Sequence, residues 1–311
     1  MSDSSLPRRV RVAASTSNLG PGFDCLGLAL SLFLEVRVHE ESSEGEHVWL
    51  ERTGHAALWP EEDDVLRRAF RKAQRLGGGG PACRLSAHSD IPIGRGFGSS
   101  GSSIAAGLLL GASLSKSPPD LETLHALGVE LEGHPDNVSA SLFGGLTLCH
   151  PTAKGGGPLL VSEGLNPALR FVLAWTDQSL PTNEARGALP AEVSFHDAVE
   201  NPRRLGLLLA GLREGRREWI EAGSRDRLHE RYRLPLIAGA EETLRAAREA
   251  GAWAANISGA GSGLVAVTSE ADAGPVAEEM RACLSRFADG AHARVVDPVL
   301  TPPAVEVQEG A

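Results

Sequence analysis

Residues 92–103 read PIGRGFGSSGSS and combine a proline turn, glycines at alternate positions and four serines. The apolar segment IAAGLLLGASL follows directly and has the length of a helix. Glycine allows a backbone with positive φ and lets a ligand come close to backbone N–H groups, while serine hydroxyls cap the start of a helix. A loop of this kind before a helix is typical of a phosphate-binding site.

The same loop also matches other patterns. Gly96, Gly98 and Gly101 satisfy GxGxxG, but a dinucleotide site needs an acidic residue roughly 20 positions later, where this chain has Lys116. The P-loop pattern GxxxxGK[ST] does not occur in the sequence. A glycine turn that merely precedes a core helix stays open as the structural alternative.

Length and composition favour a globular protein of about two domains, with 311 residues and a net charge of -10. The negative charge argues against a nucleic-acid or anionic-membrane partner. The sequence has no apolar run of about 18 residues and no apolar segment after its N-terminal arginines, so we expect a cytoplasmic protein. Four cysteines without C-x-x-C spacing predict reduced thiols: Cys25, Cys83, Cys149 and Cys283.

The residue patterns predict mixed helices and strands. A glycine- and proline-rich stretch at 152–166 indicates a domain boundary, and the second half has the strand and helix order of an α+β domain. The segment PEEDDVLRRAFRKAQRLGGGG at 60–80 predicts a helix, because acidic residues lead it, basic residues close it and a glycine run ends it. Residues 305–311 are expected to fray.

Polar side chains gather in two further places. Asn18 and Asp24 flank the turn NLGPG, where their structural role is capping. His134, Asp136 and Asn137 cluster at a proline turn before a predicted helix at 138–143, and capping accounts for one of them rather than for all three.

Four segments together resemble the GHMP small-molecule kinases. They are STSNLGPGFDCLGLAL at 15–30, the glycine loop at 92–103, EGHPDNVSASLFGG at 132–145 and NISGAGSG at 256–263. The loop is similar to the family signature P-x-x-x-G-L-G-S-S-A-A, with Phe97 in place of leucine and Gly101 in place of the first alanine. Order and spacing hold over nearly the whole chain, and the form NLGPGFD points to the branch of the family that phosphorylates L-homoserine.

The resemblance implies a two-domain α+β GHMP kinase fold. Residues 1–160 are then an N-terminal ATP-binding domain similar to ribosomal S5 domain 2, and residues 161–311 a ferredoxin-like C-terminal domain, with the site between them. It further implies ATP with Mg²⁺ as cofactors, transfer of phosphate to the hydroxyl of L-homoserine in threonine synthesis, and a homodimer.

The resemblance also implies roles for residues around the amino acid. A zwitterion needs an anion for its ammonium and a cation for its carboxylate. Asp24 matches the ammonium position, and Arg186 and Arg233 match the two arginines on the carboxylate, a task that suits a planar guanidinium. The remaining polar positions match Asn18, His134 and Asn137. Of these residues, Asn18, Asn137 and Arg186 are the expected catalytic ones.

The expected nucleotide residues are those of the loop together with one residue of the adenine side: Pro92, Ile93, Gly94, Arg95, Gly96, Phe97, Gly98, Ser99, Ser100, Gly101, Ser102, Ser103 and Asp64. For the metal, the resemblance implies Ser99 or Ser100 and Glu130. Helical periodicity does not choose between Glu130 and Glu132, so Glu132 is kept as the alternative. At the adenine side, Asp64 stands where the family has asparagine, which removes an amide donor to the base.

Asn137 stands where related kinases carry an aspartate that can act as a base. An amide does not accept a proton at neutral pH, so we expect catalysis by positioning and charge neutralisation. Two alternatives stay open at this point. One is a GHMP kinase that acts on a different small alcohol, and the other is a non-catalytic protein that binds a nucleotide on the glycine loop.

Overall fold

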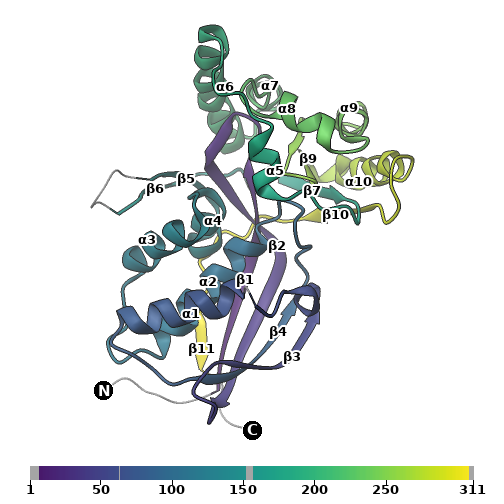
Figure 1. The fold of residues 1–311 in the computed structure, drawn as a ribbon. Coiled ribbons are helices and arrows are strands. Elements are labelled where there is room, and N and C mark those ends of the chain that lie inside the picture. The colour runs from purple at the N-terminus through teal and green to yellow at the C-terminus, as the bar shows by residue number, and fades with distance from the viewer. Residues whose placement is uncertain (1–6, 63, 152–156, 308–311) are drawn as a thin grey trace.

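The computed structural model describes residues 7–62, 64–151 and 157–307. Within them the strands form two sheets, one of seven strands and one of four (Figure 1). The first sheet belongs mainly to the N-terminal half and the second to the C-terminal half. This mixed two-sheet architecture confirms the predicted α+β class.

The first sheet is built around a long antiparallel hairpin of β1 and β2. Its strand order is β11-β1-β2-β4-β3, and β5 pairs with both β2 and β6. The strand bounds are β1 Arg8–Asn18, β2 Gly22–Glu41, β3 Val48–Gly54, β4 Cys83–Ser89, β5 Leu146–His150, β6 Leu159–Glu163 and β11 Val305–Val307. Along Leu30–Val38 of β2, buried residues alternate with more exposed ones, so one face of the sheet meets the core.

Helices cover the core side of this sheet. They are α1 Val65–Leu76, α2 Ser99–Ser113, α3 Leu121–Glu132 and α4 Asp136–Phe143, with a short 3₁₀ turn η1 His55–Leu58. Helix α2 is buried almost throughout and packs closely on α1. The helices approach each other so closely at Gly107 that a Cβ there would lie 2.3 Å from the Leu66 carbonyl oxygen. The sequence-predicted start of α4 at 138 is two residues late, since Asp136 and Asn137 lie in its first turn.

The second sheet has the order β10-β7-β9-β8, in which every pair is antiparallel. Its strands are β7 Leu169–Trp175, β8 Ala254–Ile257, β9 Leu264–Ser269 and β10 His292–Val296. Helices α9 Ala240–Glu249 and α10 Glu270–Leu284 pack on this sheet around a small apolar cluster that includes Val172, Leu244 and Met280. The other helices of this half are α5 Thr182–Gly187, α6 Phe195–Glu214, α7 Arg217–Gly223, α8 Glu230–Arg233 and the 3₁₀ turn η2 Leu234–Leu236.

The two halves share elements. The turn between β1 and β2 reaches up from the lower half of Figure 1 to lie below α6 and α7. Conversely, the C-terminal strand β11 belongs to the first sheet, where it pairs with β1 over Val305–Val307. The expectation that the chain frays from residue 305 is therefore wrong for these three residues, because backbone pairing holds them.

The domain boundary at 160/161 stays a prediction. Part of the glycine-rich stretch that indicated it, residues 152–156, lies outside the described residues, and β6 runs across the boundary position. Among the helices of the described residues, none combines the length and apolar character that a membrane span requires.

Candidate active site

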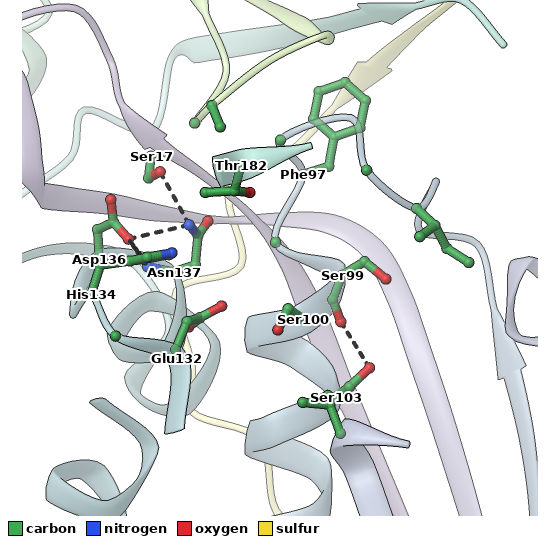
Figure 2. Close-up of a pocket in the computed structure, with 18 of the residues that line it drawn as sticks. Ser17, Phe97, Ser99, Ser100, Ser103, Glu132, His134, Asp136, Asn137 and Thr182 are labelled. Carbon is green, nitrogen blue, oxygen red and sulfur yellow. Dashed lines mark hydrogen bonds and ion pairs between the residues drawn. The ribbon is translucent and has the colours of Figure 1, made fainter. Parts of the chain in front are cut away.

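A cavity of about 640 Å³ lies between the glycine loop and elements of the C-terminal half. Its walls come from the turn after β1, the loop before α2, the turn between α3 and α4, helix α5 and the turn after β8. Figure 2 shows the serines at the start of α2 on one side of the cavity and Glu132, His134, Asp136 and Asn137 facing them. Segments that are distant in sequence thus share one concave site.

The loop before α2 needs glycine for both conformation and space. Gly96 and Gly98 have φ of 70° and 69°, in the left-handed region. A Cβ at Gly96 would lie 1.9 Å from the Ser258 carbonyl oxygen, and one at Gly98 would lie 2.0 Å from Ser15 Oγ. The loop therefore has no room for side chains at these two positions, and its backbone faces the cavity.

Helix α2 begins at Ser99, directly at the cavity. The first N–H groups of a helix have no partner within the helix and carry a partial positive charge, so they favour an anion. The Ser103 hydroxyl donates to the Ser99 carbonyl at 2.8 Å, which stabilises the first turn (Figure 2). The hydroxyl groups of Ser99 and Ser100 remain beside the cavity.

The turn after β8, residues 258–263, lies against the glycine loop. The Ser258 hydroxyl donates to the Gly96 carbonyl at 2.7 Å, and the Gly263 amide donates to the Arg95 carbonyl at 3.1 Å. On its other side, Asn18 Nδ2 donates to the Gly259 carbonyl at 2.8 Å. This turn joins the two ends of the cavity.

Glu132, at the end of α3, lines the cavity. Its Oε2 is buried and has no hydrogen-bond partner in the part of the chain that the structure describes. Burial raises the pKa of this carboxyl to about 8, and the nearby His134 charge only partly offsets the effect. A buried carboxylate oxygen without a partner, aimed into a cavity beside two serine hydroxyls, is chemically suited to a hard cation.

Glu130 lies elsewhere. Its side chain is 70% exposed and forms an ion pair with Lys72 at 3.0 Å on the outside of α3. It does not line the cavity. Placing Glu130 at the metal on the basis of resemblance is therefore not supported by the geometry, and the alternative, Glu132, faces the site.

The turn after α3 forms a compact polar group. Asp136 Oδ1 accepts from His134 Nδ1 at 2.7 Å and from the Asn137 backbone amide at 2.7 Å (Figure 2). Burial lowers the pKa of His134, but the hydrogen bond and charge of Asp136 outweigh it and raise the pKa to about 9. Asn137 is held by Ser15 Oγ, which donates to its Oδ1 at 2.9 Å, and by Ser17 Oγ, which accepts from its Nδ2 at 3.2 Å.

The turn between β1 and β2 presents Asn18 and Asp24 in an uncommon backbone conformation. Both residues have positive φ, 70° and 57°, which costs energy outside glycine. Asn18 Oδ1 accepts from the Asp24 backbone amide at 3.0 Å and fixes that residue. Strained backbone held by specific hydrogen bonds is common where side chains must be aimed at a ligand.

Arg186, on α5, forms a bidentate ion pair with Asp24. Its Nη1 and Nη2 lie 2.8 Å and 2.7 Å from the two carboxylate oxygens. Arg233, at the end of α8, also lines the cavity but is only 1% exposed. It donates through Nε to the Ala185 carbonyl and through Nη1 to the Gly259 carbonyl, each at 3.2 Å.

Comparisons with known proteins place this arrangement in a family. The family model described as the GHMP kinases N terminal domain matches residues 64–145, and the one described as GHMP kinases C terminal matches residues 208–286. A homoserine kinase from Synechococcus sp. (strain WH7803) is 40% identical over 269 residues, 86% of this chain and 85% of that protein. The chain belongs to the GHMP kinase family.

Other relatives agree with this assignment. The Thermus thermophilus homoserine kinase is 38% identical over 275 residues, which cover 88% of this GHMP kinase and 91% of the relative. A crystal structure of homoserine kinase from Cytophaga hutchinsonii superposes with a TM-score of 0.86 at 25% identity, over 96% of this chain and 97% of that one. The GHMP kinase two-domain fold expected from the sequence is therefore confirmed.

Most of the residues expected to bind the nucleotide in this GHMP kinase line the cavity. Eight of the loop do so: Ile93, Gly94, Gly96, Phe97, Gly98, Ser99, Ser100 and Ser103. The other four, which do not, are Pro92, Arg95, Gly101 and Ser102. The Arg95 guanidinium instead donates to carbonyl oxygens of Ile93, Thr176 and Asp177, so it ties the loop to the C-terminal half.

Asp64 lines the cavity, but its carboxylate is engaged within the protein. It caps α1 by accepting from the Arg67 amide at 2.9 Å, and it also accepts from Trp49 Nε1 and Arg67 Nε. The expected contact of this side chain with adenine therefore competes with three donors. In this structure the Asp64 side chain therefore acts as the N-cap of α1.

Sequence reasoning missed two parts of the site. Trp59, Pro60 and Val65 form an apolar wall next to Asp64, and no periodic pattern marked them because they lie at the ends of a 3₁₀ turn and a helix. Phe23 was also missed, although it precedes Asp24 in the motif. Its ring lies 5.7 Å from the Arg186 guanidinium and 5.1 Å from that of Arg233, so it supports both arginines.

Proposed function

We propose that this GHMP kinase transfers the γ-phosphate of ATP to the hydroxyl of L-homoserine, yielding O-phospho-L-homoserine for threonine synthesis. One observation carries the proposal: a helix start lined by glycine amides and a group of one carboxylate and two guanidinium side chains share a single cavity. The names of the homoserine kinase relatives described above support the same substrate.

The amino acid would bind by exchange with an existing ion pair. In the structure Asp24 and Arg186 form an ion pair and neutralise each other. A zwitterion inserted between them gives its ammonium to Asp24 and its carboxylate to Arg186, with Arg233 behind. A ligand with only one of these charges would leave one partner unpaired, which is costly in a partly buried site. This arrangement favours zwitterions over acids or amines of the same size.

The triphosphate would occupy the loop at 94–100. Residues of this loop and of the first turn of α2 line the cavity. Their backbone amides would hold anionic oxygens without any side-chain movement. The adenine would then lie toward the apolar wall formed by Trp59 and Val65. Because these contacts are apolar or made by backbone, they do not depend on the asparagine that Asp64 replaces.

Glu132, together with the hydroxyl of Ser99 or Ser100, would hold Mg²⁺. The buried, unpartnered Oε2 of Glu132 fits such an ion. Magnesium needs few protein ligands and keeps water and phosphate oxygens for the rest, so one carboxylate and one hydroxyl would suffice. When bound, the ion would neutralise charge on the β- and γ-phosphates.

Asn137 would orient the acceptor hydroxyl. Its amide is held on both sides by Ser15 and Ser17, so the group is positioned before substrate arrives. Asp136 is a poor base in this setting, since its Oδ1 already accepts from His134 and from the Asn137 amide. The oxygen–phosphorus bond would form as the bond to the ADP oxygen breaks, and the hydroxyl proton would pass to the transferred phosphoryl group.

A panel of acceptors tests the proposal. ADP release would be followed with L-homoserine, its deaminated analogue, its decarboxylated analogue, L-threonine and mevalonate. We expect L-homoserine to be preferred over each one-charge analogue by at least about 100-fold in kcat/KM. Preference for mevalonate would indicate another GHMP kinase, and ATP binding without ADP release in any mixture would indicate a non-catalytic protein.

The assembly and location of the enzyme are part of the same proposal. We propose a cytoplasmic homodimer without nucleic-acid or membrane partners, supported by the family resemblance, the net charge of -10 and four free cysteines. Light scattering on the purified protein distinguishes a dimer from a monomer. Binding assays with DNA, RNA and anionic vesicles at physiological salt test the absence of such partners.

A further inference from the structure

His229 lies behind the amino-acid end of the cavity and does not line it. Its side chain is fully buried, at the residue before α8. The imidazole stacks on Phe23 with ring centroids 4.9 Å apart, at an interplanar angle of 29°. His229 therefore packs against the ring that also lies next to both arginines of the site.

The two ring nitrogens of His229 face different parts of the site. Nε2 lies 2.9 Å from the Gly20 carbonyl oxygen, in the turn that presents Asn18 and Asp24. Nδ1 lies 3.4 Å from Arg233 Nη1. One imidazole thus bridges the turn of the N-terminal half and the guanidinium of the C-terminal half.

The partners determine which nitrogen carries the proton. A carbonyl oxygen only accepts and a guanidinium only donates, so Nε2 must carry the hydrogen and Nδ1 must offer its lone pair. Asp226 Oδ1, 3.8 Å from Nε2, favours the same tautomer. Burial lowers the pKa of His229, with the charge of Arg233 acting in the same direction and those of Asp226 and Asp24 opposing it, so the ring is neutral at neutral pH.

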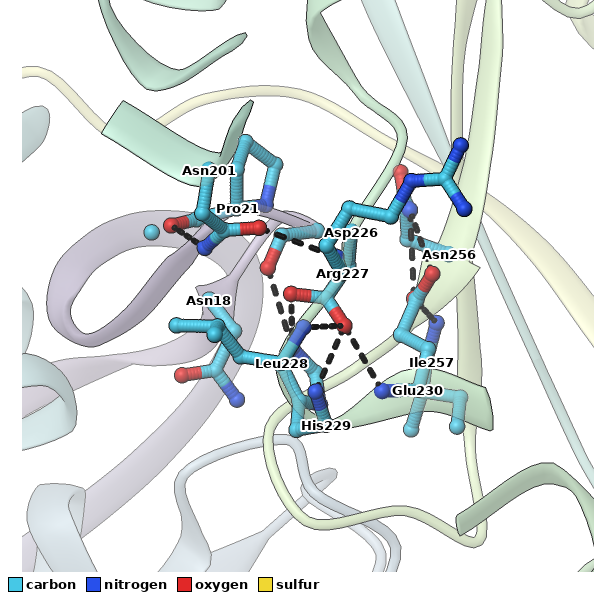
Figure 3. Close-up of polar contacts among 12 residues, drawn as sticks. Asn18, Pro21, Asn201, Asp226, Arg227, Leu228, His229, Glu230, Asn256 and Ile257 are labelled. Atoms are coloured by element: carbon cyan, nitrogen blue, oxygen red, sulfur yellow. Dashed lines mark hydrogen bonds and ion pairs between the residues drawn. The ribbon is translucent and has the colours of Figure 1, made fainter. Parts of the chain in front are cut away.

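The segment that carries His229 is itself fixed (Figure 3). Asp226 Oδ2 accepts from the backbone amides of Leu228, His229 and Glu230 at 3.0, 2.6 and 2.8 Å. Asn201 on α6 accepts from the Arg227 amide and donates to the Pro21 carbonyl, each at 2.9 Å. The β1–β2 turn is therefore held from the C-terminal half at two consecutive carbonyls, those of Gly20 and Pro21.

We propose that His229 is a positioning residue of the amino-acid site, which as a neutral Nε2–H imidazole fixes the Gly20 carbonyl with one nitrogen and orients the Arg233 guanidinium with the other. The inference rests on the proposed function, because Arg233 acts there on the substrate carboxylate. Arg233 Nε donates to the Ala185 carbonyl, and Arg233 Nη1 contacts both the Gly259 carbonyl and His229 Nδ1. These three contacts fix the orientation of the guanidinium and with it the direction of the remaining Nη2. Removal of one contact would let the guanidinium rotate.

Two substitutions separate the two nitrogens. In His229→Gln the amide N–H takes the position of Nε2, so the Gly20 contact remains and the acceptor for Arg233 is lost. In His229→Asn the amide oxygen takes the position of Nδ1, so the Arg233 contact remains and the Gly20 contact is lost. Each variant would be assayed with L-homoserine and with its carboxamide, which has the same size and no carboxylate charge.

We expect H229Q to lower the preference for L-homoserine over the carboxamide by about tenfold, the loss associated with a hydrogen bond to a charged group. H229N should lower kcat/KM for both acceptors alike and leave the preference unchanged. The KM for ATP should remain within twofold in both. Equal preference in H229Q and wild type would overturn the inference.

His47 supplies a matched control, because it is also buried and accepts a hydrogen bond from the Cys83 amide, away from the cavity. H47Q should lower the melting temperature without changing the preference, which separates loss of stability from loss of positioning. If H47Q and H229Q changed the preference equally, His229 would have no special role.

A spectroscopic measurement tests the inference without any substrate. Nitrogen-15 shifts of the His229 ring in labelled wild-type protein should show a protonated Nε2 and an unprotonated Nδ1 at pH 7 to 8. A protonated Nδ1 would overturn the inference even in an active enzyme. Absence of homoserine-dependent ADP release would instead overturn the proposed function, with the tautomer still open to measurement.

Discussion

The phosphate end of the cavity comes from one continuous loop, whereas the amino-acid end is assembled from Asp24, Arg186 and Arg233, which lie on three separate elements. The first end presents backbone amides, and side chains would obstruct it at Gly96 and Gly98. The second presents charged side chains that already pair with each other or with carbonyls. Substitutions that add side-chain atoms should therefore impair binding at the first end. Substitutions that remove a charge or change side-chain geometry should impair binding at the second.

The largest effect is expected at the loop. Gly96→Ala adds a Cβ 1.9 Å from the Ser258 carbonyl oxygen at a positive φ, so the loop must move. We expect about a 1,000-fold loss in kcat/KM for ATP, because the amides that face the phosphates are displaced. Gly45→Ala is the matched control: its φ is also positive, at 76°, but no atom lies within 4 Å of its Cβ and it does not line the cavity.

Titration with ATP and circular dichroism would be measured on both glycine variants. A folded G96A that binds ATP as well as G45A and wild type would contradict the view that the backbone forms this end of the site.

The next effect compares two glutamates on α3. Glu132→Gln should lower kcat by about 100-fold and weaken the dependence of rate on Mg²⁺, because a carboxylate in the cavity becomes an amide. Glu130→Gln, which alters an exposed pair with Lys72, should stay within twofold of wild type. Rates at a series of Mg²⁺ concentrations check both, and the reverse order of effects would return the metal to Glu130.

At the amino-acid end, Arg186→Lys keeps the charge and removes the bidentate geometry. We expect the KM for L-homoserine to rise about 30-fold with the KM for ATP unchanged, since a lysine cannot make two parallel hydrogen bonds to a carboxylate. Arg231→Lys is the control, because Arg231 pairs with Asp197 outside the cavity. Similar KM values for the two variants would place the substrate carboxylate elsewhere.

A smaller effect should follow Asn137→Ala. Loss of an orienting amide without loss of a base should lower kcat about tenfold and leave the pH dependence unchanged. The pH–rate profile of the variant is the decisive measurement. A near-total loss of turnover, together with a changed pH–rate profile, would identify Asp136 as a base.

The contrast between the two ends also explains what could be predicted from the sequence. The glycine loop could be read directly because all of its determinants are adjacent, and the fold class followed from element order and resemblance. Residue types alone could not show that Arg186 pairs with Asp24, since that contact joins positions 162 residues apart. Resemblance brought these positions together, and the structure places them in one cavity.

Other features depend on packing that local sequence does not encode. Glu130 and Glu132 are equally compatible with helical periodicity, and only the way α3 packs decides which of them is buried. Similarly, Asp64 in isolation indicates lost adenine recognition, but the neighbouring Trp49 and Arg67 make it a cap. His229 has no sequence signal of its own, because its role arises from a carbonyl in another half of the chain.

The smallest effect on turnover is expected from a substitution of Glu230. This residue follows His229 in the sequence, but its side chain contacts β8. Its carboxylate accepts from the Ile257 amide at 2.8 Å and from Asn256 Nδ2 at 3.1 Å (Figure 3). Burial raises its pKa to about 7, with Asp226 acting in the same direction and the hydrogen bonds and Arg248 opposing. Between about pH 4.5 and 7 the folded state therefore holds a proton that the unfolded chain has lost, so this group lowers stability as pH rises.

Glu230→Gln keeps an acceptor for the Ile257 amide and removes the titration. The free energy of unfolding of the variant minus that of wild type should rise by on the order of 3 kcal/mol from pH 5 to pH 8. Urea denaturation of both proteins at pH 5 and pH 8 measures these free energies. For each protein, the value at pH 5 is the reference for the value at pH 8. Parallel pH dependence in the two proteins would mean that Glu230 is ionised in the folded state throughout, with Asn256 and Ile257 stabilising its charge fully.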